Sequence, residues 1–132
     1  MCFRIFVVVQ AGRRPLRPLD FSSAKLQNQS YMKVKHIVQF QLKEELTEEQ
    51  RLPIMQAFKA GNEALPATIS TIREIRVGFN INPAEAWHNC LESTFDTLED
   101  VIAYGAHPAH QAVAGALKPH VRQRSCVDFC VE

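Results

Sequence analysis

Two imidazoles and a phenol lie within seven residues of one another in the segment Tyr104-Gly-Ala-His107-Pro-Ala-His110. Imidazole titrates near neutral pH and can donate a proton, accept one or ligate a metal ion, so the segment predicts proton transfer or a metal site. Pro108 restricts the backbone between the two histidines, so their relative position is constrained by the local geometry. The elements around this segment decide whether it is a functional site or a structured turn.

Length and composition favour a single domain. The chain has 132 residues, of which 46% are hydrophobic, and this suits one compact core. Residues 1–31 contain five Lys and Arg residues against one Asp, a balance of +4, whereas the whole chain carries +1. Residues 32–132 therefore carry −3, and a mildly acidic domain argues against a nucleic-acid partner. No apolar run approaches the roughly 20 residues that span a bilayer, so we expect no membrane partner.

The cysteines indicate a reducing compartment. None of the four belongs to a Cys-x-x-Cys motif: they are Cys2, Cys90, Cys126 and Cys130. The last two are four residues apart in a predicted strand, which at roughly 3.3 Å per residue separates them by about 13 Å, too far for a disulfide. We therefore expect reduced thiols and a cytoplasmic protein.

The first part of the chain differs from the rest. Residues 1–31 are rich in Arg and lack hydrophobic periodicity beyond a short apolar run. We interpret them as an N-terminal extension that is disordered or lies upstream of the native start, with an organelle transit peptide as the alternative. The domain then begins at Met32 and spans residues 32–132.

Hydrophobic periodicity predicts the first strand and helix of this domain. Apolar and polar residues alternate over 34–42, which is typical of a half-buried strand. Thr47 and Gln50 have the spacing of a capping box and predict a helix that extends to Pro66. Because Pro53 would remove a backbone hydrogen bond inside this helix, we expect a kink or a late start there.

The remaining pattern completes a known arrangement. It predicts strands at 72–80 and 87–95. A helix follows from a cap at Asp96 or Thr97, and a second helical segment after Gly105 extends to Lys118. The final strand is predicted at 125–131. The order β-α-β-β-α-β predicts an α+β domain with the ferredoxin-like fold.

The two faces of the first strand have different roles. The face that we expect under the helices carries Val34, His36, Val38, Phe40 and Leu42. The opposite face is mixed in character and carries Lys35, Ile37, Gln39, Gln41 and Lys43. Since helices on one side leave this second face uncovered, we expect a homodimer that closes sheet against sheet.

Four segments resemble one family in particular. Met-Lys-Val-Lys-His-Ile-Val-Gln-Phe at 32–40, Ile-Arg-Val-Gly-Phe-Asn at 75–80, the stretch 93–104 and the His-Pro-Ala-His motif at 107–110 are similar to the stress-responsive dimeric α/β-barrel (A/B barrel, Dabb) family. The resemblance covers residues 32–132. It implies a ferredoxin-like protomer whose sheet pairs with that of a second protomer to form a dimeric α/β barrel.

The resemblance also implies a site. The family includes olivetolic acid cyclase, a plant enzyme that closes a linear polyketide by aldol condensation, and its catalytic pair corresponds to His110 and Tyr104. His36 corresponds to a pocket histidine of that enzyme, whereas a pocket tyrosine on its first helix is replaced by Phe58. In such a site His110 would remove a proton alpha to a carbonyl, and Tyr104 would hydrogen-bond the resulting oxyanion.

His36 would orient either group or the ligand, and we expect Phe58, Phe40 and His107 to contact the ligand. Structural roles are the alternatives: His107 as a capping or turn residue, and His36, His110 and Tyr104 as hydrogen-bonded core residues. A metal would need a third ligand such as Asp128 or Glu92, and we expect neither a metal nor a cofactor.

Three functions therefore remain open. The first is a homodimeric stress-responsive protein with an apolar ligand pocket, which would take a small apolar or polyketide-like molecule. The second is a cofactor-independent cyclase or lyase that uses the His and Tyr pair. The third, a metal-free oxygenase, rests on analogy of fold alone. A cavity of a few hundred Å³ beside His110 is required by both enzymatic functions.

Overall fold

The computed structural model describes residues 32–132 of the chain. The prediction that residues 1–31 form an extension lies outside the described residues. None of the helices among residues 32–132 is long and apolar enough to cross a lipid bilayer.

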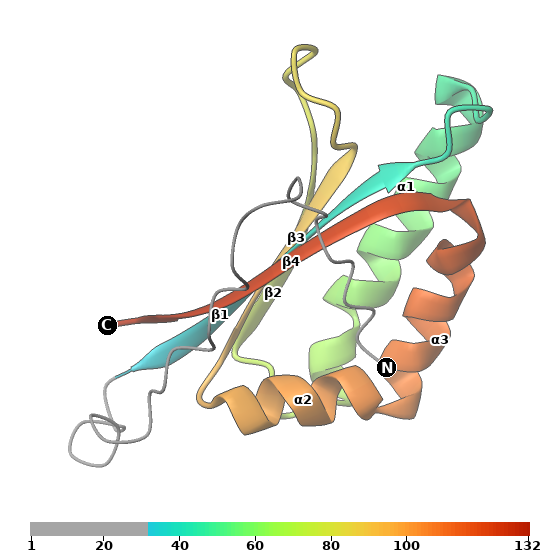
Figure 1. The fold of residues 1–132 in the computed structure, drawn as a ribbon. Coiled ribbons are helices and arrows are strands. Elements are labelled where there is room, and N and C mark those ends of the chain that lie inside the picture. Colours follow the sequence, from blue (N-terminus) through green and yellow to red (C-terminus); the bar gives the residue numbers. More distant parts are fainter. Residues whose placement is uncertain (1–31) are drawn as a thin grey trace, which may run out of the picture.

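Four strands form one antiparallel sheet with the order β2-β3-β1-β4. Along the chain the elements are β1 (Lys33–Leu42), α1 (Glu48–Glu63), β2 (Glu74–Phe79), β3 (Asn89–Phe95), α2 (Leu98–Ala106), α3 (Pro108–Leu117) and β4 (Val121–Val131). Two short 3-10 helices, η1 (Leu65–Ala67) and η2 (Lys118–His120), follow α1 and α3. All three α-helices lie on one side of the sheet (Figure 1). The predicted ferredoxin-like α+β fold is therefore confirmed.

The alternation in β1 places its side chains as predicted. Val34, His36, Val38 and Leu42 are buried on the side that faces the helices. The register sets His36 opposite Ser93 of β3 and opposite Asp128 of β4. β4 pairs with the edge of β1 that β3 does not occupy. The last strand of the chain therefore contributes side chains to the same face of the sheet as the first strand.

Helix α1 begins where the capping box predicts. The Thr47 hydroxyl accepts a hydrogen bond from the backbone N–H of Gln50, and the Gln50 side chain accepts one from the N–H of Thr47. The helix then continues through Pro53, so the alternative of a late start is wrong. Pro53 removes a single hydrogen bond to a carbonyl of the first turn, and the double cap stabilises that turn in spite of the loss.

The second helical segment is divided at His107, as predicted. Thr97 caps α2, since its hydroxyl accepts a hydrogen bond from the N–H of Asp100. His107 ends α2 and starts α3, and its Nδ1 accepts a hydrogen bond from the N–H of Ala109. Pro108 occupies the first position of α3, where its missing N–H costs nothing.

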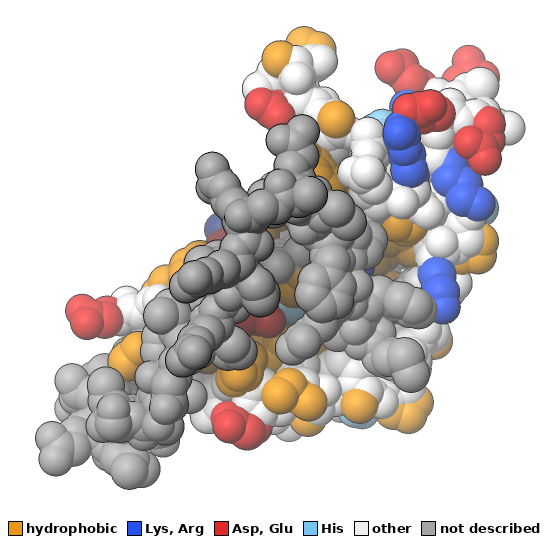
Figure 2. Space-filling model, in the orientation of Figure 1, with side chains coloured by type: hydrophobic (Ala, Val, Ile, Leu, Met, Phe, Trp, Pro, Cys, Tyr) orange, Lys and Arg blue, Asp and Glu red, His pale blue; other side chains and the backbone are white. Residues whose placement is uncertain are grey.

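The bounds of β2, β3 and β4 differ from the predictions. β2 and β3 are shorter than 72–80 and 87–95, because Ile72 and Trp87 precede the residues that pair with the neighbouring strand. β4 begins at Val121 instead of Ser125, because its polar start pairs with the end of β1. A strand at the edge of a sheet tolerates such charged side chains. On the face seen in Figure 2, Lys and Arg side chains gather where α3 leads into β4.

Candidate functional site

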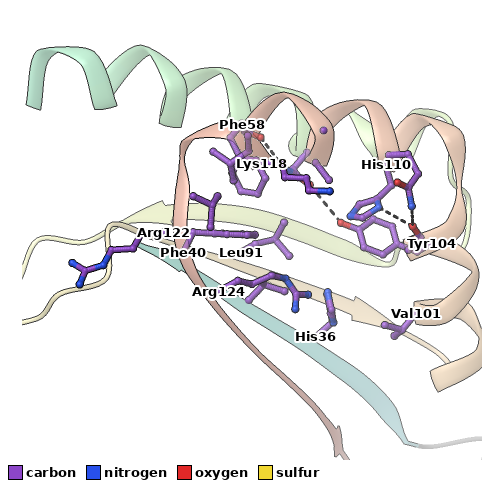
Figure 3. Close-up of a pocket in the computed structure, with 18 residues that line it drawn as sticks. His36, Phe40, Phe58, Leu91, Val101, Tyr104, His110, Lys118, Arg122 and Arg124 are labelled. Carbon is purple, nitrogen blue, oxygen red and sulfur yellow. Dashed lines mark hydrogen bonds between the residues drawn. The ribbon is translucent and has the colours of Figure 1, made fainter. Parts of the chain in front are cut away.

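A cavity of about 590 Å³ lies between the helices and the sheet (Figure 3). Its apolar wall is formed by Val38, Phe40, Phe58, Leu91, Val101 and Leu117. Its polar lining includes side chains from four different elements: His36 of β1, Asn62 of α1, Tyr104 of α2 and His110 of α3. The cavity therefore brings together the three residues that the sequence singled out for chemistry.

Tyr104 lies at the centre of this polar group. Its side chain is only 2% exposed, and its ring centroid is 4.3 Å from that of His110 and 6.0 Å from that of His36. The Tyr104 hydroxyl donates a hydrogen bond of 3.4 Å to the side-chain oxygen of Asn62. The Asn62 amide nitrogen in turn donates to the carbonyl of Phe58, at 2.8 Å, which fixes the orientation of the amide.

The sequence predictions did not include Asn62. It is buried, and it follows Phe58 by four residues on the apolar side of α1. A lone amide in the apolar stripe of an amphipathic helix needs a hydrogen-bond partner inside the protein. The position of Asn62 in this apolar stripe is therefore the sequence feature that could have indicated a functional role for it.

His110 presents one nitrogen as a base. Its Nδ1 lies 3.1 Å from the carbonyl oxygen of Gly105. Because a carbonyl only accepts hydrogen bonds, Nδ1 carries a proton and donates it, which leaves a lone pair on Nε2. Burial lowers the pKa of His110, the Gly105 contact raises it, and the positive charge of His36 lowers it again, so that the net shift is downward. At neutral pH the ring is therefore uncharged and able to accept a proton.

His36 differs from His110 in its charge. It is 3% exposed, and its Nδ1 lies 2.5 Å from a carboxylate oxygen of Asp128 and 3.7 Å from the sulfur of Cys126. Burial acts to lower the pKa of His36, but the hydrogen bonds to Asp128 and Cys126 together outweigh it and raise the pKa to about 9. His36 is therefore an imidazolium at neutral pH, and its Nδ1–H donates to Asp128.

This pair links the stability of the fold to pH. The pKa of His36 in the folded protein lies above the ordinary value of 6.5 that we expect in the unfolded chain. The folded state consequently binds the proton more tightly than the unfolded state does. The stabilisation is complete below about pH 6.5, and it is lost as the pH rises through about 9.

Comparison with known proteins identifies the family. The model of the stress responsive A/B barrel domain matches residues 34–131. The chain belongs to this family. A dimeric protein of unknown function and ferredoxin-like fold from Bacteroides fragilis is 47% identical, with a TM-score of 0.72 over 74% of this chain and 94% of that chain. None of the curated protein sequences compared with the chain is significantly similar to it.

More distant structures share the fold of this A/B barrel domain. A dimeric ferredoxin-like protein of unknown function from Thermobifida fusca is 24% identical, covers 76% of this chain and 92% of its own, and has a TM-score of 0.63. The hydroxynitrile lyase from Passiflora edulis is 20% identical over 76% of this chain and 94% of its own, with a TM-score of 0.60. At these identities the likeness concerns the fold alone.

The apolar end of the A/B barrel cavity contains the two phenylalanines expected to contact a ligand. The rings of Phe40 and Phe58 meet edge to face, with centroids 5.2 Å apart. Phe58 stands where the resemblance implies a tyrosine, so this end of the cavity lacks a hydroxyl. His107 does not line the cavity, because its ring nitrogen is bound to the backbone of α3. The structure supports the capping role considered for His107 and gives no support to a ligand contact.

Within residues 32–132, the donor atoms of His36, Cys126 and Asp128 lie within 4.8 Å of one another and could share a cation. The pair of His107 and His110 is not part of this group. At neutral pH the imidazolium of His36 donates a hydrogen bond to Asp128. An ion pair therefore accounts for the short distance between these two side chains without a metal ion. Cys126 and Asp128 also approach the same nitrogen of His36, whereas a nucleophile activated by a histidine needs the opposite ring nitrogen.

Proposed function

We propose that this A/B barrel protein binds a small, mainly apolar molecule in the cavity and acts as a homodimer. The observation that carries the proposal is the cavity itself. Its volume of about 590 Å³ lies in the range of roughly 300–1,000 Å³ that is typical of small-molecule sites. An apolar wall with a few converging polar groups at one end is the usual composition of such sites.

Filling the cavity should abolish binding. Ala114 lines it, and an Ala114→Phe variant adds a ring to that space. We expect the wild type to bind members of a panel of medium-chain alcohols and alkylphenols in calorimetric titrations, and the variant to lose at least about tenfold in affinity. Ala103→Phe, on the exposed side of α2, is the matched control and should bind like the wild type. Absence of binding by the wild type, or equal binding by Ala114→Phe, would contradict the proposal.

The face of the sheet opposite the helices supports the proposed dimer. It exposes Val127 and Phe129 of β4, which are 53% and 44% exposed, close to Ile37 of β1. On the same face the buried hydroxyl oxygen of Thr94 has no hydrogen-bond partner among the described residues. Apolar side chains and an unsatisfied polar atom on one surface favour burial against a second copy. The relatives from Bacteroides fragilis and Thermobifida fusca are described as dimeric.

A charge on this face should dissociate the dimer. We expect the wild type to sediment as a dimer and Phe129→Asp to sediment as a monomer, because a buried carboxylate without a partner is costly. Ile81→Asp is the control, since Ile81 is 96% exposed in a loop between β2 and β3. A wild-type monomer, or a Phe129→Asp variant as dimeric as the wild type, would refute sheet-to-sheet pairing.

A second candidate function is acid–base catalysis of the cyclase or lyase type. The specific observation in its favour is the uncharged His110, with a lone pair on Nε2, beside the Tyr104 hydroxyl. In this reaction Nε2 removes a proton alpha to a ligand carbonyl, and the electron pair moves onto the carbonyl oxygen. Tyr104 then turns its hydroxyl from Asn62 to this enolate oxygen.

The same residues can complete an intramolecular aldol step. The enolate carbon forms a bond with a second carbonyl carbon of the ligand, and the electron pair of that carbonyl moves onto its oxygen. The alkoxide takes back the proton that His110 holds, so protons and electrons balance without a cofactor.

Rates on a panel of β-polyketone thioesters test this function. We expect His110→Ala to lower kcat/KM by roughly a hundredfold or more and Tyr104→Phe by about tenfold or more. His120→Ala, at the half-buried end of η2, controls for loss of a histidine elsewhere. Equal rates for the wild type, His110→Ala and Tyr104→Phe, including no turnover by any of them, would remove the catalytic assignment.

A further inference from the structure

The charged side chains around the cavity share one sign. Among residues 32–132, the cavity is lined by His36, Lys118, Arg122 and Arg124, and no Asp or Glu of these residues lines it. The same residues of the chain carry a net charge of −3. Cationic side chains are therefore concentrated at the cavity of an otherwise acidic domain, and two of them, His36 and Arg122, pair with Asp128 and Glu44.

Two of these cations are directed toward the polar end of the cavity. In Figure 3 the Lys118 side chain extends from η2 toward His110 and Tyr104, and the Arg124 side chain extends from β4 toward His36. Arg122 points away from the cavity and forms an ion pair with Glu44. The positive charge of Arg124 also acts on the His110 ring, whose pKa is lowered first by burial and further by His36 and Arg124.

The position of the two cations suits one end of an elongated ligand. Arg124 pairs with Phe40 across β1 and β4, and its side chain extends from there toward His36. Phe40, Phe58 and Leu91 form the apolar wall, and they offer nothing that recognises a charge. A ligand with an apolar body would therefore leave its head group next to Lys118, Arg124 and the imidazolium of His36.

We propose that the cavity is specific for a monocarboxylate with an apolar chain or ring, and that Lys118 and Arg124 bind its carboxylate. This inference rests on the ligand-binding function proposed above. A planar guanidinium matches the two oxygens of a carboxylate, and hydrogen bonds between ions are stronger than those between neutral groups. The carboxylate would lie close to His110, so a ligand with a carbonyl near its acid group would place that carbonyl within reach of Nε2.

Three eight-carbon ligands whose head groups differ in charge test the proposal. We expect calorimetric titration at neutral pH and low salt to show octanoate binding at least about tenfold more tightly than octanamide, and octylamine binding most weakly. The advantage of octanoate over octanamide should shrink as salt is added, because the cations lie near solvent.

Variants assign the effect to the two cations. Arg124→Gln and Lys118→Gln should each lower the affinity for octanoate by about fivefold or more and leave that for octanamide unchanged. Lys43→Gln is the matched control and should bind octanoate like the wild type, because Lys43 is exposed and does not line the cavity.

The outcomes separate this inference from the function on which it rests. If octanamide and octanoate bind equally well, the carboxylate specificity is overturned while ligand binding stands. The specificity is also overturned if Lys43→Gln weakens octanoate binding as much as Lys118→Gln or Arg124→Gln does. If none of the three ligands binds the wild type, both the specificity and the proposed ligand-binding function fail.

Discussion

The buried positive charge of His36 is the constraint on which the site depends. An imidazolium that is withdrawn from water requires a nearby carboxylate, and Asp128 supplies it from the adjacent strand. This contact exists only in the register that sets His36 opposite Asp128, so the charge and the pairing of β1 with β4 stabilise each other. Burial, together with the positive charge of His36, lowers the pKa of His110, which therefore remains uncharged at neutral pH. One histidine is thus held as an acid and the other as a base, a separation of pKa values that is common where protons are transferred.

The division of the second helical segment places the base. If α2 continued past Ala106 as one helix, His110 would follow the direction of α2, whereas α3 turns away from it at a large angle (Figure 1). Pro108 and the His107 cap begin a new helix, and the Gly105 carbonyl at the end of α2 is then available to accept a hydrogen bond from His110. The proline that made this segment conspicuous in the sequence therefore has a geometric function: it orients a ring nitrogen toward the cavity.

Local rules predicted most of the fold. Alternation predicted β1 and its two faces, the spacing of Thr47 and Gln50 predicted the start of α1, and a cap was the alternative role considered for His107. These features depend on neighbours in the sequence. The start of β4 was missed because its first residues are mainly polar, and their pairing with β1 depends on contacts between the two ends of the domain.

The site was predicted only in part, for the same reason. The family resemblance indicated His36, Tyr104 and His110, but the partner of His36 lies 92 residues away in the sequence, so its charge could not be derived before the register was known. Asn62, in contrast, lies in the apolar stripe of a helix that was predicted, and its need for a partner was visible there.

The protonation of the two cavity histidines tests their opposite charge states most directly. Long-range proton–nitrogen NMR spectra of the ¹⁵N-labelled protein, recorded from about pH 5 to about pH 10, report the state of each ring nitrogen. We expect His36 to keep both protons until the pH approaches about 9, and His110 at neutral pH to carry its proton on Nδ1 alone. A His36 that loses its proton at or below its ordinary pKa of 6.5, or a His110 protonated on Nε2 at neutral pH, would contradict this assignment of acid and base.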